Sequence, residues 1–446
     1  MGFGKKSARN GLRAALLAGA AVAAFGLGGL NAGTASAALS CQGENIKGEG
    51  SSLQKEAQIE VWTKLFSSSI CNKGTHATVN YTSVGSGTGL KQWNSDGALG
   101  HINTEFSFIG TDDAPTTAQL ANMESVAGGA NVAVIPVAQT SIAILANPPV
   151  GCTISKITNQ ELEKVFEGVT IKWSKLEGAS GGAACEKAIV RVVRKDGSGT
   201  TYQFKNYLNA AKNKALACTT GKVPLGEGET DKNRTWKELE PVTDATSGLP
   251  NVAWPEKCTE ASFLTKVVRP AANGGAEVVA KVKSTEGAIG YAAYPDALAG
   301  GAQTLEVQNN GQGSFESATF GGPGSNGEAN CTATKYVVPT AARRGEGTGL
   351  SADWSQVFGA KATIGGTAYP LCTLTFVLAF NKYSSAGFTQ KAEITTHDYI
   401  KEYVEAAQGQ SDIINSGKGY NGAPSSTVKT NNVLGAGQFA AEKIGF

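Results

Sequence analysis

The sequence has few residues that bind transition metals and no excess of either charge. It contains three histidines, and its eight cysteines include no Cys-x-x-Cys pair, so no metal site is expected. After residue 37 no apolar run is long enough to cross a bilayer. Beyond that residue the chain holds 35 Lys and Arg, four fewer than the full 39, against 37 Asp and Glu. This balance gives no reason to expect nucleic acid or an anionic membrane surface as a partner.

The first 37 residues have the composition of an export signal. Four basic residues precede a small-apolar stretch from 14 to 30, and Ala35-Ser36-Ala37 is a cleavage pattern. We therefore exclude residues 1–37 from the fold and expect the protein in the periplasm or outside the cell envelope. The remaining 409 residues are enough for two domains. Residues 38–40 fit a lipidation signal poorly, so we expect no lipid anchor at Cys41.

Export makes disulfide bonds the default state of the cysteines, all of which follow the signal. Eight cysteines allow 105 connectivities, and the order along the chain suggests that neighbours pair. The predicted pairs are Cys41–Cys71, Cys152–Cys185, Cys218–Cys258 and Cys331–Cys372.

The octapeptide 194–201, Arg-Lys-Asp-Gly-Ser-Gly-Thr-Thr, is the most informative stretch of the chain. The β-branched run before it predicts a buried strand, and the apolar spacing after it predicts a helix. Ser198 is a good N-cap, and the free N–H groups at a helix start bind anions. Arg194 adds a forked cation that Asp196 can hold in place. The octapeptide is neither a Walker loop nor Gly-x-Gly-x-x-Gly, and by itself it fits an ordinary glycine-rich loop equally well.

Two further units of strand, Gly/Ser turn and helix occur at 46–66 and 77–93, and residues 106–115 end a strand in two acids before a proline. Strands therefore alternate with helices, which predicts an α/β fold with mostly parallel sheets. In such folds ligands lie beyond the carboxyl ends of strands, next to helix N-termini. The three units and the acids thus predict one shared site. Other strands are expected at 131–137, 141–145 and 373–380, and helices at 158–166 and 396–407.

Four motifs follow one another in a specific order. They are Gly48-Glu-Gly-Ser-Ser52, Val79-Asn-Tyr-Thr-Ser-Val-Gly-Ser86, Gly110-Thr-Asp-Asp-Ala-Pro115 and Arg194-Lys-Asp-Gly-Ser-Gly-Thr200. Together they resemble the phosphate-binding proteins of bacterial phosphate ABC importers. The likeness runs from about residue 46 to the C-terminal helix and omits loop insertions near 212–258 and 300–345.

The resemblance implies an α/β periplasmic-binding-protein fold of type II. Two lobes, each with a mixed, mostly parallel sheet flanked by helices, would close over a ligand held between them. One lobe would comprise residues 42–138 plus 291–446, and the other residues 139–290.

The resemblance also implies a set of ligands for inorganic phosphate. Asp196 would orient Arg194 rather than touch phosphate. Phosphate keeps a proton at neutral pH and can donate it to Asp113, whereas sulfate has none to donate, so a buried acceptor there selects against sulfate. No cofactor or metal is implied. Carried over motif by motif, the phosphate-binding residues are Ser52, Leu53, Ser86, Asp113, Arg194, Ser198, Gly199 and Thr200.

Two positions depart from the pattern of the family. Ser52 and Leu53 stand where the family usually shows Thr-Phe, so a side-chain contact there is expected to be weaker or made by the backbone. Asp112 stands where a small residue is usual. Because adjacent residues on a strand point to opposite faces, we expect Asp113 to face the site and Asp112 to face away.

The function expected from these features is capture of phosphate outside the cytoplasm by a monomer that delivers it to an ABC permease, without catalysis. One alternative is an exported phosphate-scavenging or surface protein with no permease partner, which the glycine-rich insertions allow. Another is a binder of sulfate or a phosphonate, which Asp113 disfavours. A phosphatase is not expected, because neither Ser86 nor Ser198 has a motif-linked histidine.

Overall fold

The fold was analysed in a computed structural model. It describes residues 39–71, 77–168, 170, 172–212, 223–225, 229–231, 274–309, 313–319, 331, 336–355, 357, 368–405 and 408–445. The predicted export signal and the predicted pair Cys218–Cys258 lie outside these residues. Ser40–Phe446 form one compact unit. None of the helices in the described ranges combines the length and apolar character needed to cross a membrane.

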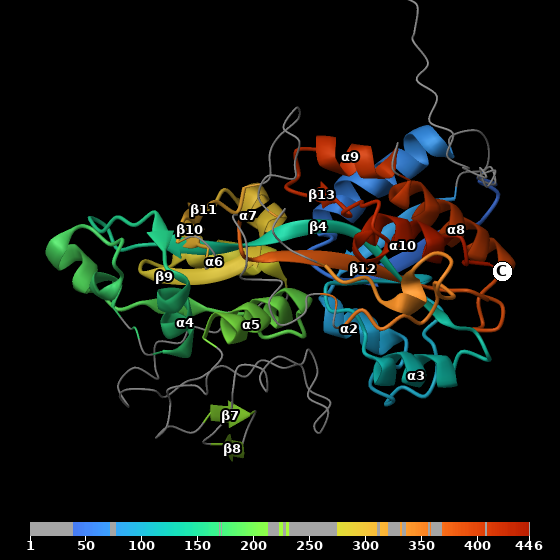
Figure 1. Ribbon diagram of the computed structural model, residues 1–446, viewed down its shortest axis with the longest axis horizontal. Coiled ribbons are helices and arrows are strands. Elements are labelled where there is room, and N and C mark those ends of the chain that lie inside the picture. Colours follow the sequence, from blue (N-terminus) through green and yellow to red (C-terminus); the bar gives the residue numbers. More distant parts are fainter. Residues whose placement is uncertain are drawn as a thin grey trace, which may run out of the picture. The chain divides into compact units, whose positions relative to one another are not determined.

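Strands and helices alternate along the chain, which confirms the expected α/β class (Figure 1). The strands are β1 (Ile46–Gly50), β2 (Val79–Ser83), β3 (Phe108–Thr111), β4 (Val132–Asn147), β5 (Lys156–Ile157), β6 (Val190–Val192), β7 (Val223–Leu225), β8 (Glu229–Asp231), β9 (Ala288–Ala293), β10 (Thr304–Gln308), β11 (Phe315–Glu316), β12 (Cys372–Phe380) and β13 (Asn421–Gly422). The α-helices are α1 (Thr63–Leu65), α2 (Ser86–Gln92), α3 (Thr117–Ser125), α4 (Asn159–Glu167), α5 (Gly199–Lys212), α6 (Gly275–Ser284), α7 (Tyr294–Gly300), α8 (Gln390–Val404), α9 (Gly409–Asn415) and α10 (Val433–Ala441). The shorter turns are η1 (Ala57–Trp62) and η2 (Phe66–Ile70), both π-helical, and the 3₁₀ turns η3 (Trp173–Lys175), η4 (Gly182–Glu186), η7 (Thr340–Ala342) and η8 (Lys429–Asn431).

The main sheet is mixed, with strand order β11-β10-β4-β12-β3-β1-β2. The pairs β1–β2, β1–β3, β6–β9 and β5–β10 are parallel. Six other pairs of this sheet in the described residues are antiparallel, so parallel pairing is less dominant than the sequence predicts. β12 inserts between β3 and β4 and runs opposite to both, and β4 also runs opposite to β9, β10 and β13.

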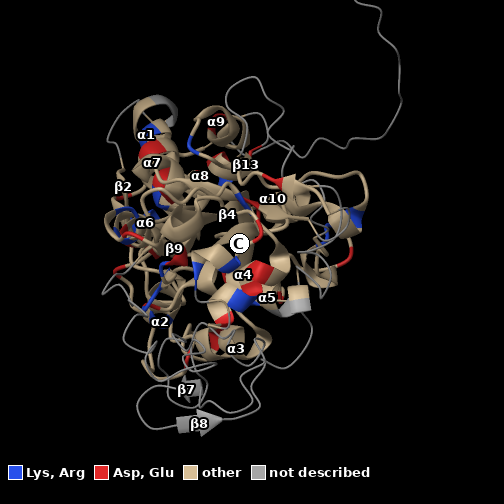
Figure 2. Ribbon diagram, turned by 90° about the vertical axis from the view of Figure 1, so that its left-hand side faces the viewer, with Lys and Arg blue, Asp and Glu red and all other residues tan. Residues whose placement is uncertain are grey.

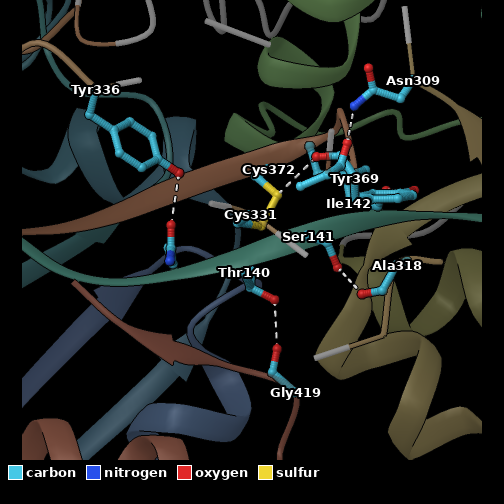
Figure 3. The surroundings of a disulfide bond; sticks show 12 residues. Thr140, Ser141, Ile142, Asn309, Ala318, Cys331, Tyr336, Tyr369, Cys372 and Gly419 are labelled. Carbon is cyan, nitrogen blue, oxygen red and sulfur yellow. Dashed lines mark hydrogen bonds between the residues drawn. A yellow bond between two sulfur atoms is a disulfide. The ribbon is translucent and has the colours of Figure 1, made fainter. Parts of the chain in front are cut away.

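The apolar runs predicted as two strands form the single strand β4. The polar residues between them do not interrupt it, because each is buried and hydrogen-bonded (Figure 3). Gln139 Oε1 accepts a hydrogen bond from the Tyr336 hydroxyl at 3.1 Å. Thr140 Oγ1 donates to the Gly419 carbonyl at 2.7 Å, and Ser141 Oγ donates to the Ala318 carbonyl at 2.5 Å.

Two hydrophobic cores are joined by β4 and β12. The first core takes β4 up to Ala138, together with β1, β3, α8 and α10. The second begins at Ile142 and includes α4, α5, α6 and β9. In β12, Cys372 belongs to the second core and Leu374 to the first. The change from one core to the other therefore falls on the polar middle of β4 and near the start of β12.

Three of the four predicted disulfide bonds are confirmed. Within the described residues the chain forms Cys41–Cys71, Cys152–Cys185 and Cys331–Cys372. The last of these ties residue 331 to the start of β12, beside the polar middle of β4 (Figure 3). Charged residues of both signs are interspersed along the ribbon in Figure 2, in keeping with the near-neutral balance of the sequence.

Candidate functional site

The octapeptide forms the predicted link between a strand and a helix. β6 precedes it, and α5 begins at Gly199. Ser198 is the predicted cap, because its Oγ accepts the backbone N–H of Thr201 at 3.1 Å. Tyr291 of β9 contacts both ends of the octapeptide. Its hydroxyl lies 2.7 Å from Thr201 Oγ1 and accepts the backbone N–H of Arg194 at 3.4 Å. The helix start is thus fixed against the second core.

Arg194 is buried and forms the predicted pair with Asp196. Its Nε donates to Asp196 Oδ1 at 2.5 Å and its Nη2 donates to Oδ2, a bidentate contact that fixes the guanidinium plane. Burial opposes the charged form, but the hydrogen bonds and charge of Asp196 outweigh it and raise the pKa of Arg194. The third nitrogen, Nη1, donates to Ser52 Oγ at 3.1 Å. Arg194 is therefore a fixed cation that reaches from the second core to the first.

Ser52 and Ser86 follow strands β1 and β2, whose side chains pack in the first core. Ser52 follows β1 and is buried, and Ser86 is the first residue of α2. Gly85 precedes it with φ +96°, and a Cβ there would lie 2.6 Å from Asp196 Oδ2. The backbone N–H of Gly87 donates to the Gly197 carbonyl at 2.9 Å. The turn before α2 and the turn before α5 therefore touch directly.

Asp112 faces this site, and the expectation that it points away is wrong. β3 ends at Thr111, so the acids lie in the bend after the strand, where side chains no longer alternate between faces. Asp112 Oδ2 accepts from Ser86 Oγ at 3.5 Å and from Thr200 Oγ1 at 3.4 Å. Asp113 is buried beside it, and its backbone N–H donates to Thr111 Oγ1 at 3.1 Å.

Gly199 lets α5 approach the acids closely. A Cβ at this position would lie 2.7 Å from the Cβ of Asp112 and 2.8 Å from both the Asp113 nitrogen and Ser86 Oγ. Any larger residue would clash with atoms of the first core. The first turn of α5, Ser86 and the acids are thus packed into one site, as their motifs predict.

Leu53 differs from the other predicted residues, because its side chain is part of the first core. Its carbonyl accepts a hydrogen bond from the Tyr420 hydroxyl. Only its backbone N–H is suited to an anion there, which agrees with the weaker contact expected at this departure from the family pattern.

Sequence reasoning missed several residues that hold the site in place. Ser51 and Thr375 donate to Asp112 Oδ1, and Gln203 Nε2 donates to the Asp112 carbonyl at 3.2 Å. Ser51 lies inside the first motif, whereas Thr375 is 263 residues from Asp112 and no local pattern indicates the contact. Across the described ranges no group of His, Cys, Asp and Glu is arranged to hold a metal ion.

Asp296, in the first turn of α7, is a further buried acid near the site. Its Oδ2 has no hydrogen-bond partner among the described residues, and a Cβ on Gly275 would lie 2.0 Å from that atom. Burial raises the pKa of Asp296 to about 7. Between pH 4 and 7 the unfolded chain therefore loses this proton while the folded chain keeps it, and the free energy of unfolding falls as pH rises.

Asp296→Asn is expected to increase the free energy of unfolding at pH 8, by up to about 4 kcal/mol, and to leave it unchanged at pH 4. The reason is that asparagine removes the buried charge that the wild type acquires only at high pH. Urea unfolding at both pH values measures the effect. A change of equal size at pH 4 and pH 8 would show that the side-chain charge is not the cause.

One known protein family matches most of this chain. The sequence profile of the PBP superfamily domain matches residues 35–405. The chain belongs to the PBP superfamily. Among curated proteins of the superfamily, the phosphate-binding protein PstS of Pasteurella multocida is 28% identical over 204 residues, covering 44% of this chain and 50% of that one. PstS3 of Mycobacterium bovis is 28% identical over 215 residues, covering 47% and 54%. The chain spans about half the length of these curated relatives.

Solved structures of phosphate-binding proteins share the fold. A periplasmic phosphate-binding protein, PfluDING, solved with bound phosphate, is 19% identical with a TM-score of 0.57, covering 90% of this chain and 99% of that one. A phosphate-binding protein from Stenotrophomonas maltophilia is 17% identical with a TM-score of 0.56, covering 88% and 93%. These likenesses confirm the two-lobed periplasmic-binding-protein fold expected from the sequence.

Proposed function

We propose that this protein captures inorganic phosphate outside the cytoplasm and delivers it to the permease of an ABC importer. The observation that carries the proposal is the convergence of Arg194 and the capped start of α5 with Ser52 and Ser86 of the other core. A dehydrated oxyanion needs nearly all of its oxygens hydrogen-bonded, and hydroxyl groups with helix N–H groups meet that need at little net charge. The names of the curated relatives support phosphate as the anion.

Each predicted residue has a role in this proposal. Ser52, Ser86, Ser198 and Thr200 donate hydroxyl protons, Leu53 and Gly199 donate backbone N–H groups, and Arg194, oriented by Asp196, supplies the charge. Asp113 accepts the proton that phosphate carries. Its place directly before Ala-Pro in the third motif supports this assignment, and its burial against α5 makes an unpaired contact with sulfate costly.

The lobes of the proposed transporter component are residues 42–138 plus 291–446 and residues 139–290. The cores support this division up to residue 289, whereas many residues from Tyr291 to Cys372 pack with the second core rather than the first. In this proposal the working form is a monomer, because closure of the lobes over phosphate requires no second subunit. The protein binds and releases phosphate without catalysis.

Calorimetry of the chain from residue 38 onward, with phosphate and then sulfate, tests the proposal. Carried-over ligand is first removed by unfolding and refolding. Phosphate is expected to bind tightly and sulfate not at all, and Asp113→Asn is expected to lose about 10- to 100-fold in preference for phosphate, because a charged hydrogen bond contributes about 1.5–3 kcal/mol. A refolded wild type that ignores phosphate would end the proposal. Phosphate uptake in a deletion strain separates transport from scavenging.

One stretch of the sequence has the Gly-x-Ser-x-Gly pattern of a hydrolase nucleophile, but its structure does not support that role. Residues 178–182, Gly-Ala-Ser-Gly-Gly, have the letters Gly-x-Ser-x-Gly. Ser180 is exposed, however, and its backbone pairs with Thr153 in an isolated bridge, at 2.7 and 2.9 Å, rather than at a strand-to-helix turn.

A further inference from the structure

The two carboxylate oxygens of Asp112 have partners of different kinds. The residue is only 1% exposed. Oδ1 accepts from Ser51 Oγ, and from Thr375 Oγ1 at 2.9 Å, and neither of these residues belongs to the proposed phosphate ligands. Oδ2 instead accepts from Ser86 and Thr200, which do. One oxygen thus faces the scaffold of the first core and the other faces the ligand site.

The contacts on the scaffold side fix Oδ1. Thr375 Oγ1 accepts from Gln54 Nε2 at 2.6 Å, and Ser51 Oγ accepts the backbone N–H of Gln54 at 3.3 Å. Each hydroxyl therefore has its single proton left to donate. Asp112 Oδ1 is the nearer acceptor for Thr375, since the Thr111 carbonyl lies at 3.3 Å. The carboxylate is held in one orientation whether or not a ligand is present.

The contacts on the ligand side are long. Hydroxyl-to-oxygen hydrogen bonds are typically about 2.7–2.8 Å, whereas Ser86 and Thr200 lie 3.5 and 3.4 Å from Oδ2. Ser86 Oγ already accepts the backbone N–H of Asp112 at 3.1 Å, so its own proton is available for donation. An anion that takes the protons of both hydroxyls leaves Oδ2 buried, facing negative charge, with neither donor. The charged form of the carboxyl group is disfavoured in that state.

The groups around Asp112 bear on its titration. Arg194 is the cation that faces it, and the charge of Arg194 is shared with Asp196. The acid Asp296 and the phenols of Tyr81 and Tyr420 also lie within electrostatic range. Even without an anion, burial raises the pKa of Asp112 to about 6, although its hydroxyl partners and Arg194 lower it. Neighbouring Asp113 and a bound anion both add negative charge.

We propose that Asp112 is a second acid that contacts the anion directly, which takes up a proton when phosphate binds and donates it from Oδ2 to a phosphate oxygen. The inference rests on the proposed function. The proton comes from solvent, Asp113 accepts the proton that phosphate carries, and no covalent bond changes. The paired acids then complete the hydrogen bonding of the phosphate dianion, one as donor and the other as acceptor.

Calorimetry at pH 8, in two buffers of different ionisation enthalpy, counts the protons taken up. At that pH phosphate is mainly the dianion, so wild type is expected to take up close to one proton per phosphate. Asp112→Asn has the shape of the protonated acid, with an amide in place of the hydroxyl group that would donate. This variant is expected to take up almost none and to bind phosphate at pH 8 up to about 100-fold more tightly, because about two pH units separate pH 8 from the pKa of Asp112.

Asp113→Asn is the matched control, since it alters the neighbouring acid in the same bend. It is expected to keep the uptake linked to Asp112 and to lose discrimination against sulfate. Wild-type binding without proton uptake would overturn the inference and leave phosphate binding intact. Uptake that persists in Asp112→Asn would assign the proton to phosphate itself and would also overturn it. A wild type that binds phosphate without uptake overturns the inference even if a variant does not fold, whereas a wild type that binds no phosphate removes the proposed function as well.

Discussion

Arg194→Gln is expected to reduce phosphate affinity on the order of 100-fold and to lower the free energy of unfolding by roughly 3–5 kcal/mol. The first effect follows from loss of the buried cation that donates to Ser52 within the site. The second follows because Asp196, which is buried, loses the bidentate partner that neutralises it. Calorimetry and urea unfolding measure the two effects separately.

The double variant Arg194→Gln/Asp196→Asn distinguishes these causes. It leaves no buried charge uncompensated, so stability is expected to return to near the wild-type value while phosphate affinity stays low. If the single variant were as stable as wild type, the pair would not be buried in solution as it is in the structure. If the double variant recovered affinity, Arg194 would not be part of the anion site.

Gly199→Val is expected to weaken phosphate binding by about 100-fold or more. Overpacking a close contact costs roughly 1–3 kcal/mol per insertion, and here three atoms of the first core lie within 2.8 Å of the position of the new Cβ. Since those atoms belong to the turns around Ser86 and Asp112, the clash arises only when α5 meets the first core. Because α5 already contacts the first core in the structure, the free energy of unfolding without ligand is also expected to fall, by roughly 1–3 kcal/mol, as measured with urea.

Asn206→Val, a half-buried position on the same helix, is the control for placing a β-branched residue in α5. It is expected to bind phosphate as wild type does. Equal affinity in Gly199→Val and wild type would mean that α5 and the two acids do not approach each other when phosphate is bound.

The features that were predictable from the sequence are those fixed by nearby residues. Ser198 caps α5, and Arg194 pairs with Asp196 two positions away, because short-range geometry brings these groups together in any fold. The helix predicted from residue 158 likewise begins where Thr158 and Glu161, three positions apart, form a capping box at the start of α4.

The features that sequence reasoning missed depend on residues far apart in the chain. The orientation of Asp112 depends on Thr375 of β12, which donates to its Oδ1. It also depends on β3 ending at Thr111, so that Asp112 lies after the strand and not on it. The single strand β4 exists because distant segments supply partners for its polar middle. α8 begins at Gln390, earlier than the predicted residue 396, since Thr389 caps it there by accepting the Ala392 N–H at 3.0 Å. Local patterns hold no information about such partners.

The position of β4 in the sheet has a consequence for how the chain folds as it emerges. All but the last of its sixteen residues are buried, yet its long ladder is with β12, which begins 225 residues after β4 ends. Sheets built from such distant pairings form slowly and leave strand edges open meanwhile. A chain shortened before Cys372 would retain an apolar strand without that partner and would aggregate rather than fold. Until β12 has been made, β4 therefore lacks the partner of its longest ladder.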